Sequence, residues 1–350
     1  DTLMYKTIWW AMGHSSQQIN VSAHVAIWYA IAAIVLGAKP LSEKVSRMAF
    51  LMYILFLQLA SAHHLLVEPG ISSEWKIFNT SYALYLAVIG SMVHGMTVPG
   101  SIEAAQRRRG FTSGLFEWLR RAPWDNPAFA GMFLSLIMFG FLGGISGVVL
   151  GTEQINIIMH NTLYVPGHFH ATVVAGTTLA FMAVTYLLLP LIFRRKLILT
   201  KWAKLQPYVF GIGVAGISLF MMGAGTLGVA RRHWDITFAG SALSFDYPGA
   251  AFLMMGLNGI FAILAAVGGL MYIIVTVGTV FFGERVGDQE AVPVGLPAME
   301  PSKAAAVGTY GSEEHPKIPG TVMLVAVFFV AFMLYYFVNW KYLSEIWPLS

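Results

Sequence analysis

Long apolar stretches recur along the chain and alternate with shorter segments that carry most of the charged residues. A helix needs about 20 mostly apolar residues to cross a bilayer. Eight stretches meet that requirement: residues 7–38, 48–66, 76–100, 127–150, 161–193, 207–230, 248–283 and 319–342. The pattern predicts an all-α polytopic membrane protein with eight transmembrane helices in a single membrane domain over residues 1–350. The Ala/Glu/Pro/Gly-rich segment 284–317 is typical of a solvated loop.

The composition agrees with a membrane protein and limits its chemistry. Charged residues make up 11% of the 350 residues, whereas a soluble domain carries about 25%. The chain contains no cysteine, which excludes disulfides, thiolate metal sites and cysteine nucleophiles. Any metal bound by this chain must therefore be held by nitrogen or oxygen ligands.

Lysine and arginine fall unevenly on the two sides of the predicted spans. Of the 21 basic residues, 16 lie in one set of alternate loops and 5 in the other. The basic side is cytoplasmic by the positive-inside rule, so both ends of this chain are expected outside. The net charge of +4 follows from this topology, and we expect no nucleic-acid partner. We expect membrane lipid to surround the predicted spans.

Five histidines lie at one depth of the predicted bundle. His14 lies about seven residues into the first span from the outside, His63 and His64 near the outer end of the second, and His168 and His170 about eight residues into the fifth. At about 1.5 Å per residue, all five lie roughly 10 Å below the outer surface. A single histidine within a span is usually hydrogen-bonded to a neighbouring helix, but five imidazoles in one plane indicate a metal or haem site.

Helix geometry divides these histidines into groups. Residues two apart on a helix differ by about 200° in direction, so His168 and His170 face opposite sides and serve different centres. His63 and His64 differ by about 100° and could converge on one ion where a helix loosens at its end. With His14 they form a three-imidazole site that suits copper, iron or zinc.

Several motifs carry a resemblance to a known family. They are the segment HNTLYVPGHFH at 160–170, the His63-His64 pair followed by Glu68-Pro69-Gly70, the run WWAMGH at 9–14, the block PWDNPAF at 123–129, and Arg231-Arg232. At these residues the chain resembles the catalytic subunit (subunit I) of the haem–copper oxidase superfamily, and within it the B family. The likeness covers essentially the whole chain and corresponds to helices six to thirteen, the C-terminal two-thirds of that bundle.

The resemblance implies two haems, one low-spin and one high-spin, and one non-haem metal, copper or iron. His168 would be the axial ligand of the high-spin haem and His170 a ligand of the low-spin haem. The non-haem metal would be held by His14, His63 and His64. The resemblance assigns further residues to the haem propionates and to a proton path: Arg231, Arg232 and His160 to the propionates, and Tyr29 and Ser42 to the proton path. For Tyr29 and Ser42, ordinary polar residues near a helix end are an equally good interpretation.

The chain departs from the oxygen reductases of this superfamily at one catalytic position. Most of them carry a tyrosine four residues after the first metal-site histidine, where the i, i+4 spacing puts both groups on one helix face. Here that residue is Gln18, and the position used by the C-type oxidases, six residues before the histidine pair, is Leu57. The tyrosine supplies an electron and a proton when the oxygen–oxygen bond breaks, so its absence weakens an oxygen-reductase interpretation.

Nitric oxide reduction is the favoured interpretation and oxygen reduction to water, coupled to proton translocation, is the alternative. Joining two nitric oxide molecules needs only two electrons and two protons, and nitric oxide reductases of the superfamily lack the tyrosine. Gln18 could offer its carbonyl oxygen as a ligand or hydrogen-bond partner. In the alternative, Gln18 fills a polar pocket in an unusual oxidase. A transporter is less favoured, because it predicts broken helices and polar residues at the midplane, whereas these histidines cluster near one surface. A bis-histidine haem electron carrier is less favoured, because His14, His63 and His64 would then have no purpose.

The resemblance also implies partners and a location. Family members have five further helices upstream, one of which supplies the second histidine of the low-spin haem, so we expect upstream helices or a second chain to complete that site. An electron-donating subunit, containing copper or a cytochrome, is expected as well. The expected location is the cytoplasmic (inner) membrane of a prokaryote, with the metal centres nearer the outer face.

Overall fold

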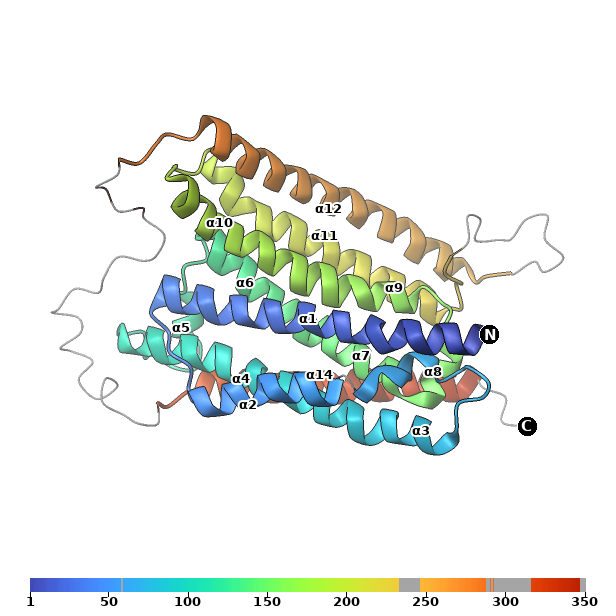
Figure 1. Cartoon of the computed structure of the whole chain (residues 1–350). Helices are drawn as coiled ribbons and strands as arrows, with labels where there is room; N and C mark the ends of the chain where they lie inside the picture. Colours follow the sequence, from blue (N-terminus) through green and yellow to red (C-terminus); the bar gives the residue numbers. More distant parts are fainter. Residues whose placement is uncertain (58, 233–245, 288–289, 291, 293–315, 347–350) are drawn as a thin grey trace.

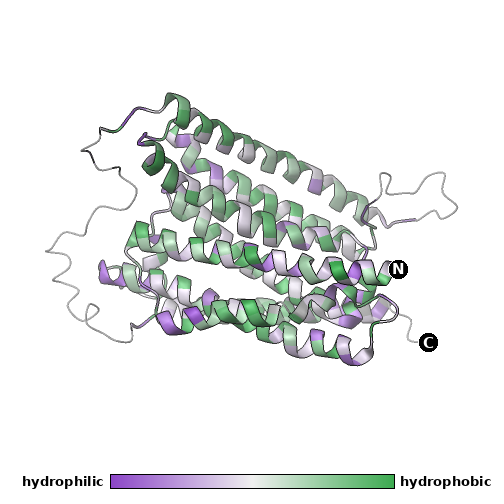
Figure 2. Cartoon of the chain, viewed as in Figure 1, coloured by the Kyte–Doolittle hydropathy of each residue, from purple (hydrophilic) through white to green (hydrophobic). Residues whose placement is uncertain are grey.

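The computed structural model describes residues 1–57, 59–232, 246–287, 290, 292 and 316–346, and these form a bundle of long helices (Figure 1). Seven helical stretches are long and apolar enough to cross a membrane: Thr2–Leu36, Ser73–Arg108, Pro127–Gly151, Tyr164–Phe193, Thr200–Thr226, Gly249–Phe282 and Pro319–Tyr342. Apolar residues dominate these helices (Figure 2). The structure confirms the predicted all-α polytopic membrane fold. Most of the predicted loop 284–317 lies outside the described residues.

Several of these stretches are composite, because turns of π-helix interrupt the α-helix. The α-helices are α1 (Thr2–Leu36), α2 (Glu43–Met52), α3 (Ser73–Ile77), α4 (Leu84–Arg108), α5 (Glu117–Arg120), α6 (Pro127–Met138), α7 (Ile145–Gly151), α8 (Glu153–Met159), α9 (Tyr164–Phe169), α10 (Leu179–Phe193), α11 (Thr200–Thr226), α12 (Gly249–Phe282) and α14 (Pro319–Ile346). The π-helical turns are η1 (Tyr53–Leu57), η3 (Phe78–Ala83), η4 (Phe139–Gly144) and η5 (His170–Thr178), and η2 (Ala60–Leu65) is a 3₁₀ turn. π-Helical turns are frequent at functional sites.

The second predicted span, 48–66, is the one missing from these seven stretches, and it takes a form that the sequence pattern does not predict. Only its first residues continue the α-helix α2, and the chain then passes through η1 and η2. Together these elements run along the bundle from the end where α1 finishes to the end where α3 begins (Figure 1). Of the eight predicted spans, seven are therefore long helical stretches, some with π-helical turns, and one is a broken segment. The broken part matters because η2 carries His63 and His64.

Close packing of α11 on α12 depends on glycines that leave no side chain between the two backbones. A Cβ atom built on Gly268 would lie 2.6 Å from the Cα of Phe210, and one built on Gly213 would overlap the backbone of Ala265. Small residues at such crossings let membrane helices approach closely enough for van der Waals contact along their length. This pair forms one side of the bundle in Figure 1.

A buried carboxylate joins the C-terminal helix to the rest of the bundle. Glu103 on α4 is fully buried and accepts hydrogen bonds from the backbone amides of Gly320 at 3.0 Å and Thr321 at 2.6 Å, in the first turn of α14. Its partner one turn later is Arg107, whose Nε donates to Glu103 at 2.8 Å and which is 3% exposed. Glu103 thus satisfies backbone donors that a helix start leaves open and balances a buried guanidinium.

We expect Glu103→Ala to destabilise the protein by about 3–5 kcal/mol, the usual cost of removing one partner of a buried ion pair. The matched control is Glu43→Ala, because Glu43 forms the same i, i+4 pair with Arg47 on the protein surface, with side chains 68% and 77% exposed. Exposed pairs of this kind contribute little. Thermal unfolding in detergent should therefore show a clearly lower midpoint for Glu103→Ala only. Equal midpoints for the two variants would contradict the role assigned to Glu103.

Candidate functional site

Three of the predicted histidines meet at one point between α1 and η2. Ligand atoms of His14, His63 and His64 all lie within 4.8 Å of one another, and Nδ1 of His14 is 2.9 Å from Nε2 of His64. Three imidazole nitrogens at this separation form a donor set suited to copper, iron or zinc. The structure thus brings together the three residues that the sequence assigned to one metal.

Neighbouring side chains hold this three-histidine group in place. The ring of Trp10, one helical turn before His14, stacks on His64 with centroids 3.9 Å apart and planes 5° from parallel. Asn79 accepts a hydrogen bond at 3.1 Å from the backbone amide of Ala62, which fixes the 3₁₀ turn that carries the histidine pair. The sequence indicated neither contact, because each joins residues far apart or in irregular backbone.

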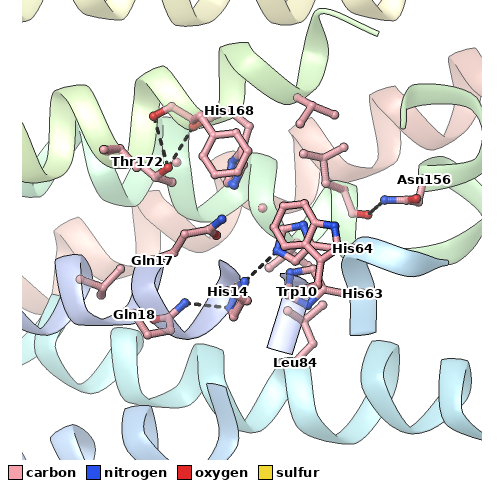
Figure 3. Close-up of a pocket in the computed structure, with 18 of the residues that line it drawn as sticks. Trp10, His14, Gln17, Gln18, His63, His64, Leu84, Asn156, His168 and Thr172 are labelled. Atoms are coloured by element: carbon pink, nitrogen blue, oxygen red, sulfur yellow. Dashed lines mark hydrogen bonds between the residues drawn. The ribbon is translucent and has the colours of Figure 1, made fainter. Parts of the chain in front are cut away.

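Two glutamines on the same face of α1 approach His14 (Figure 3). Nε2 of Gln18 lies 2.9 Å from Nε2 of His14, while Oε1 of Gln18 is buried without a partner among the described residues. Gln17 lines the same cavity. Buried polar atoms are nearly always paired, so the unpaired Oε1 of Gln18 is an acceptor that rotation of the amide could direct to the ring of His14. Sequence reasoning singled out Gln18 but gave no role to Gln17.

His168 faces the three-histidine group across a cavity of about 520 Å³ (Figure 3). That volume is in the range of cofactor and ligand pockets. On the side of η4 and α7, glycines line the space beside His168, and a Cβ atom on Gly147 would lie 3.0 Å from Cε1 of its ring. His170 is absent from the described cavity lining. The two histidines therefore face different sides, as their spacing predicts.

Each of these two histidines has a partner for Nδ1. Ser146 Oγ lies 2.9 Å from Nδ1 of His168, and Nδ1 of His170 donates to the carbonyl oxygen of Pro166 at 2.7 Å. Because the single proton of the Ser146 hydroxyl is directed to the carbonyls of Leu142 and Gly143, the Ser146 oxygen is left to accept the Nδ1 proton of His168. Nε2 then carries the lone pair, which is the tautomer that a haem ligand needs.

If His168 holds a haem iron as the resemblance implies, Ser146→Ala should lower the activity at that haem about 10- to 100-fold, as loss of an outer-shell partner typically does. The alanine leaves the Nδ1–H of His168 without its acceptor, so the imidazole would become a weaker iron ligand. Resonance Raman spectroscopy of the reduced protein should show the iron–histidine stretch at lower frequency. Ser218→Ala is the control, because Ser218 is a buried serine that bonds only to its own helix at Val214. An unchanged stretch in Ser146→Ala would refute the assignment.

The end of the cavity near the start of α1 is polar and positively charged. It is lined by Lys6, Glu68, His160, Arg231 and Arg232, with Lys6 Nζ 2.7 Å from Glu68. Nε of Arg231 is buried without a partner among the described residues. Burial and the nearby charge of Arg231 lower the pKa of His160. An unpaired guanidinium donor beside a second arginine fits the carboxylates of a haem, and the predicted propionate residues thus lie together.

Local backbone contacts place the two arginines. The amide of Arg231 donates to the carbonyl of Asn161 at 2.9 Å, so the segment after α11 pairs with the segment that precedes α9. At the end of α11, a Cβ atom on Gly225 would overlap the backbone nitrogen of Tyr164. Arg232 has a φ of 65°, a left-handed conformation that is uncommon outside glycine. The start of the helix that carries His168 and the arginine pair are therefore positioned together.

The two residues assigned to a proton path do not contact each other. The hydroxyl of Tyr29 donates to Ser46 at 3.1 Å and lies 3.0 Å from Nδ1 of His94, while Ser42 caps the start of α2. Sequence reasoning gave no role to His94 or to His24, which is buried and lies 3.0 Å from Thr177. His233 and His315, which also received none, lie outside the described residues.

The sequence profile of the family described as "Cytochrome C and Quinol oxidase polypeptide I" matches residues 1–271. The chain is 36% identical over 238 residues to cytochrome c oxidase subunit 1 of Thermus thermophilus, covering 67% of this chain and 42% of that protein. It is 26% identical over 241 residues to quinol oxidase subunit 1 of Sulfolobus acidocaldarius, with 66% and 42% covered. The chain thus spans less than half the length of these two relatives.

A solved structure shares the fold. The cryo-EM structure of a heme–copper terminal oxidase dimer superposes with a TM-score of 0.74 at 24% identity, covering 94% of this chain and 57% of that chain. The family match covers most of the chain, and the histidines described above lie within it. We conclude that this multi-pass membrane chain belongs to the haem–copper oxidase subunit I family.

Proposed function

We propose that this chain is the catalytic part of a respiratory membrane oxidoreductase that reduces nitric oxide to nitrous oxide. The observation that carries the proposal is Gln18. It lies against His14, where the oxygen reductases that the sequence resembles carry a tyrosine. An amide cannot give up an electron and a proton as a phenol does. Among the described residues that line the cavity the only tyrosine is Tyr5, whose side chain is 65% exposed.

The reaction fits a site without a phenol. Two nitric oxide molecules, two protons and two electrons give one nitrous oxide and one water. Cleavage of the oxygen–oxygen bond, by contrast, needs four electrons at once, and the tyrosine supplies one of them in the oxygen reductases that the chain resembles. The haem and the non-haem metal would together supply the other three, and joining two nitric oxide molecules needs only two. A site without a phenol is therefore sufficient for nitric oxide and one electron short for oxygen.

The residues present fit the cofactors of this family. His168 would hold a high-spin haem and His170 a low-spin haem, and His14, His63 and His64 would hold a non-haem copper or iron. Arg231, Arg232 and His160 would bind haem propionates. When bound, the haems and the metal would supply the electrons and the positions at which the gas binds. The protein's own contribution is ligand geometry, hydrogen bonding to the ligands and a cavity that excludes bulk water.

Gln18 has a specific task in this arrangement. Nδ1 of His14 faces His64, so Nδ1 is the nitrogen that a metal between them would engage. The neutral ring then carries its proton on Nε2, and Gln18 is the residue positioned to accept it. Rotating the Gln18 amide by about 180° exchanges Nε2 and Oε1. Oε1, which has no partner among the described residues, then faces that proton. Gln18 would thus fix the tautomer and direction of His14, as outer-shell acceptors do at other metal sites.

Protons would come through polar side chains of α1, α2 and α4. The hydroxyl groups of Ser46 and Tyr29 and the ring of His94 form a connected series. Nearer the cavity, Tyr53 lies 2.9 Å from Ser91, and Ser91 lines the cavity. We propose Tyr29 as a member of this path. Ser42 would act only at its entrance, because its hydroxyl already caps α2.

The proposed function also requires partners. The low-spin haem needs a second axial ligand, which we propose comes from upstream helices or a second chain. Electrons would come from a copper- or cytochrome-containing subunit, since this chain has no cysteine for a copper–thiolate site. The proposed location is a prokaryotic inner membrane with the metal centres nearer the outer face.

Oxygen reduction to water is the second candidate, because the relatives reported above are named oxidases. The two functions are separated by supplying the purified complex with an artificial electron donor and comparing a nitric oxide electrode with an oxygen electrode. We expect fast loss of nitric oxide and little oxygen uptake. Fast oxygen uptake with little loss of nitric oxide would refute the proposal and identify an oxidase without a tyrosine at either known position.

A further inference from the structure

Gln17 lies in the middle of the cavity, on the path between the two sets of ligands. It follows His14 by three residues on α1, so the two side chains share a helix face. Its amide lies between His168 and His14 (Figure 3). The amide that hydrogen-bonds with His14 is that of Gln18, and the amide of Gln17 faces the cavity. The proposed function gives the amide of Gln17 no task.

A primary amide is an unexpected side chain at this position. The cavity that Gln17 lines also includes apolar residues such as Val21, Phe139 and Val173, and a polar group that leaves water for a partly apolar space costs free energy unless it is paired. Leucine or valine at position 17 would pack against these apolar residues without the cost of desolvating an amide. Gln18 already provides an amide beside His14. The second amide therefore calls for a partner inside the cavity.

We propose that Gln17 donates a hydrogen bond from its Nε2 to the oxygen atom of the gas held between His168 and the three-histidine group. This inference rests on the proposed gas-reducing function and names the residue that orients the substrate. As electrons enter two nitric oxide molecules and the nitrogen–nitrogen bond forms, negative charge grows on their oxygen atoms. A fixed N–H donor in a water-poor cavity stabilises such charge more strongly than water does.

The test is the infrared spectrum of carbon monoxide bound to the reduced holoenzyme. A donor at the oxygen atom weakens the carbon–oxygen bond, so its removal raises the stretching frequency. Gln17→Met keeps the length of the side chain and removes the donor, and we expect the band to move to higher wavenumber. Nitric oxide turnover should fall about 100-fold, the loss typical when one donor to a developing oxyanion is removed.

Two further variants make the result specific. Gln17→Asn keeps the amide but withdraws it by one methylene, so its band should lie between those of wild type and Gln17→Met; it also serves if Gln17→Met does not assemble with haem. Gln206→Leu is the matched control, because it removes a fully buried amide that bonds to Tyr186 on α10, outside the described cavity lining. Its band should stay at the wild-type position.

The outcomes separate this inference from the proposed function. An unchanged band in Gln17→Met, in protein that retains its haem spectrum, overturns the role of Gln17 even if nitric oxide is the substrate. A shifted band in an enzyme that consumes oxygen instead supports the contact between Gln17 and the gas while refuting nitric oxide as substrate. A band that shifts equally in Gln206→Leu also overturns the inference, because the effect would then be general.

Discussion

Replacing His64 by alanine should remove the non-haem metal and leave the haems in place. The variant keeps two of the three imidazoles that lie within 4.8 Å of one another, and two ligands hold a metal far less well than three. We expect metal analysis to fall from about one non-haem metal per chain to a small fraction of that. Gas reduction should fall by more than about 100-fold, the upper end of the effect of losing an outer-shell partner.

His160→Ala is the control for this experiment. His160 lines the same cavity but lies outside the three-histidine group, so its loss should leave the non-haem metal content unchanged. Optical spectra should show that both variants retain high-spin and low-spin haem. Full metal occupancy in His64→Ala would show that the non-haem metal is bound elsewhere, and would contradict the site assigned to His14, His63 and His64.

The second large effect is expected for His168→Gly. The glycine removes the nitrogen that faces the cavity, while His170 keeps its bond to the carbonyl of Pro166. The high-spin haem should be lost or become spectrally abnormal, and the low-spin haem should remain. Activity should fall to background, and imidazole added to the buffer should restore part of the high-spin spectrum, because the variant leaves space for a free ring.

A different spectral result would revise the assignment. Loss of the low-spin signal with retention of the high-spin signal would show that the two histidines have exchanged roles. Loss of both signals would be ambiguous, and His168→Met then gives the decision, since a side chain of similar size keeps the helix packed. We expect His168→Met to retain the low-spin haem. Loss of that haem would contradict the assignment of His170 as its ligand.

The sequence predicted much of the site, because the residues that form it lie at fixed distances along regular helices. The depth of His14, His63, His64 and His168 follows from counting residues into apolar spans, and the opposite faces of His168 and His170 follow from helical rotation. The structure brings His14, His63 and His64 together and places His168, but not His170, in the described lining of the cavity. The motifs also predicted the family correctly, since the sequence profile matches over residues 1–271.

Other features depend on contacts between distant segments or on irregular backbone, which periodicity does not indicate. The π-helical and 3₁₀ turns of the segment from Tyr53 to Leu65 were predicted as one helix, because their composition is as apolar as that of a regular span. The bond of Ser146 to His168 and the cap that Glu103 provides for α14 join different helices. Gln17 was not singled out, because its neighbour Gln18 occupies the position that the resemblance emphasises.

The central claim is that electrons delivered to this cavity join two nitric oxide molecules. The most direct measurement supplies the purified complex with ¹⁵N-labelled nitric oxide and a counted number of electrons, and quantifies doubly labelled nitrous oxide by mass spectrometry. We expect one nitrous oxide for every two electrons in the wild type, and none above background in His64→Ala. Electrons consumed without nitrous oxide, or nitrous oxide formed equally well by His64→Ala, would contradict it.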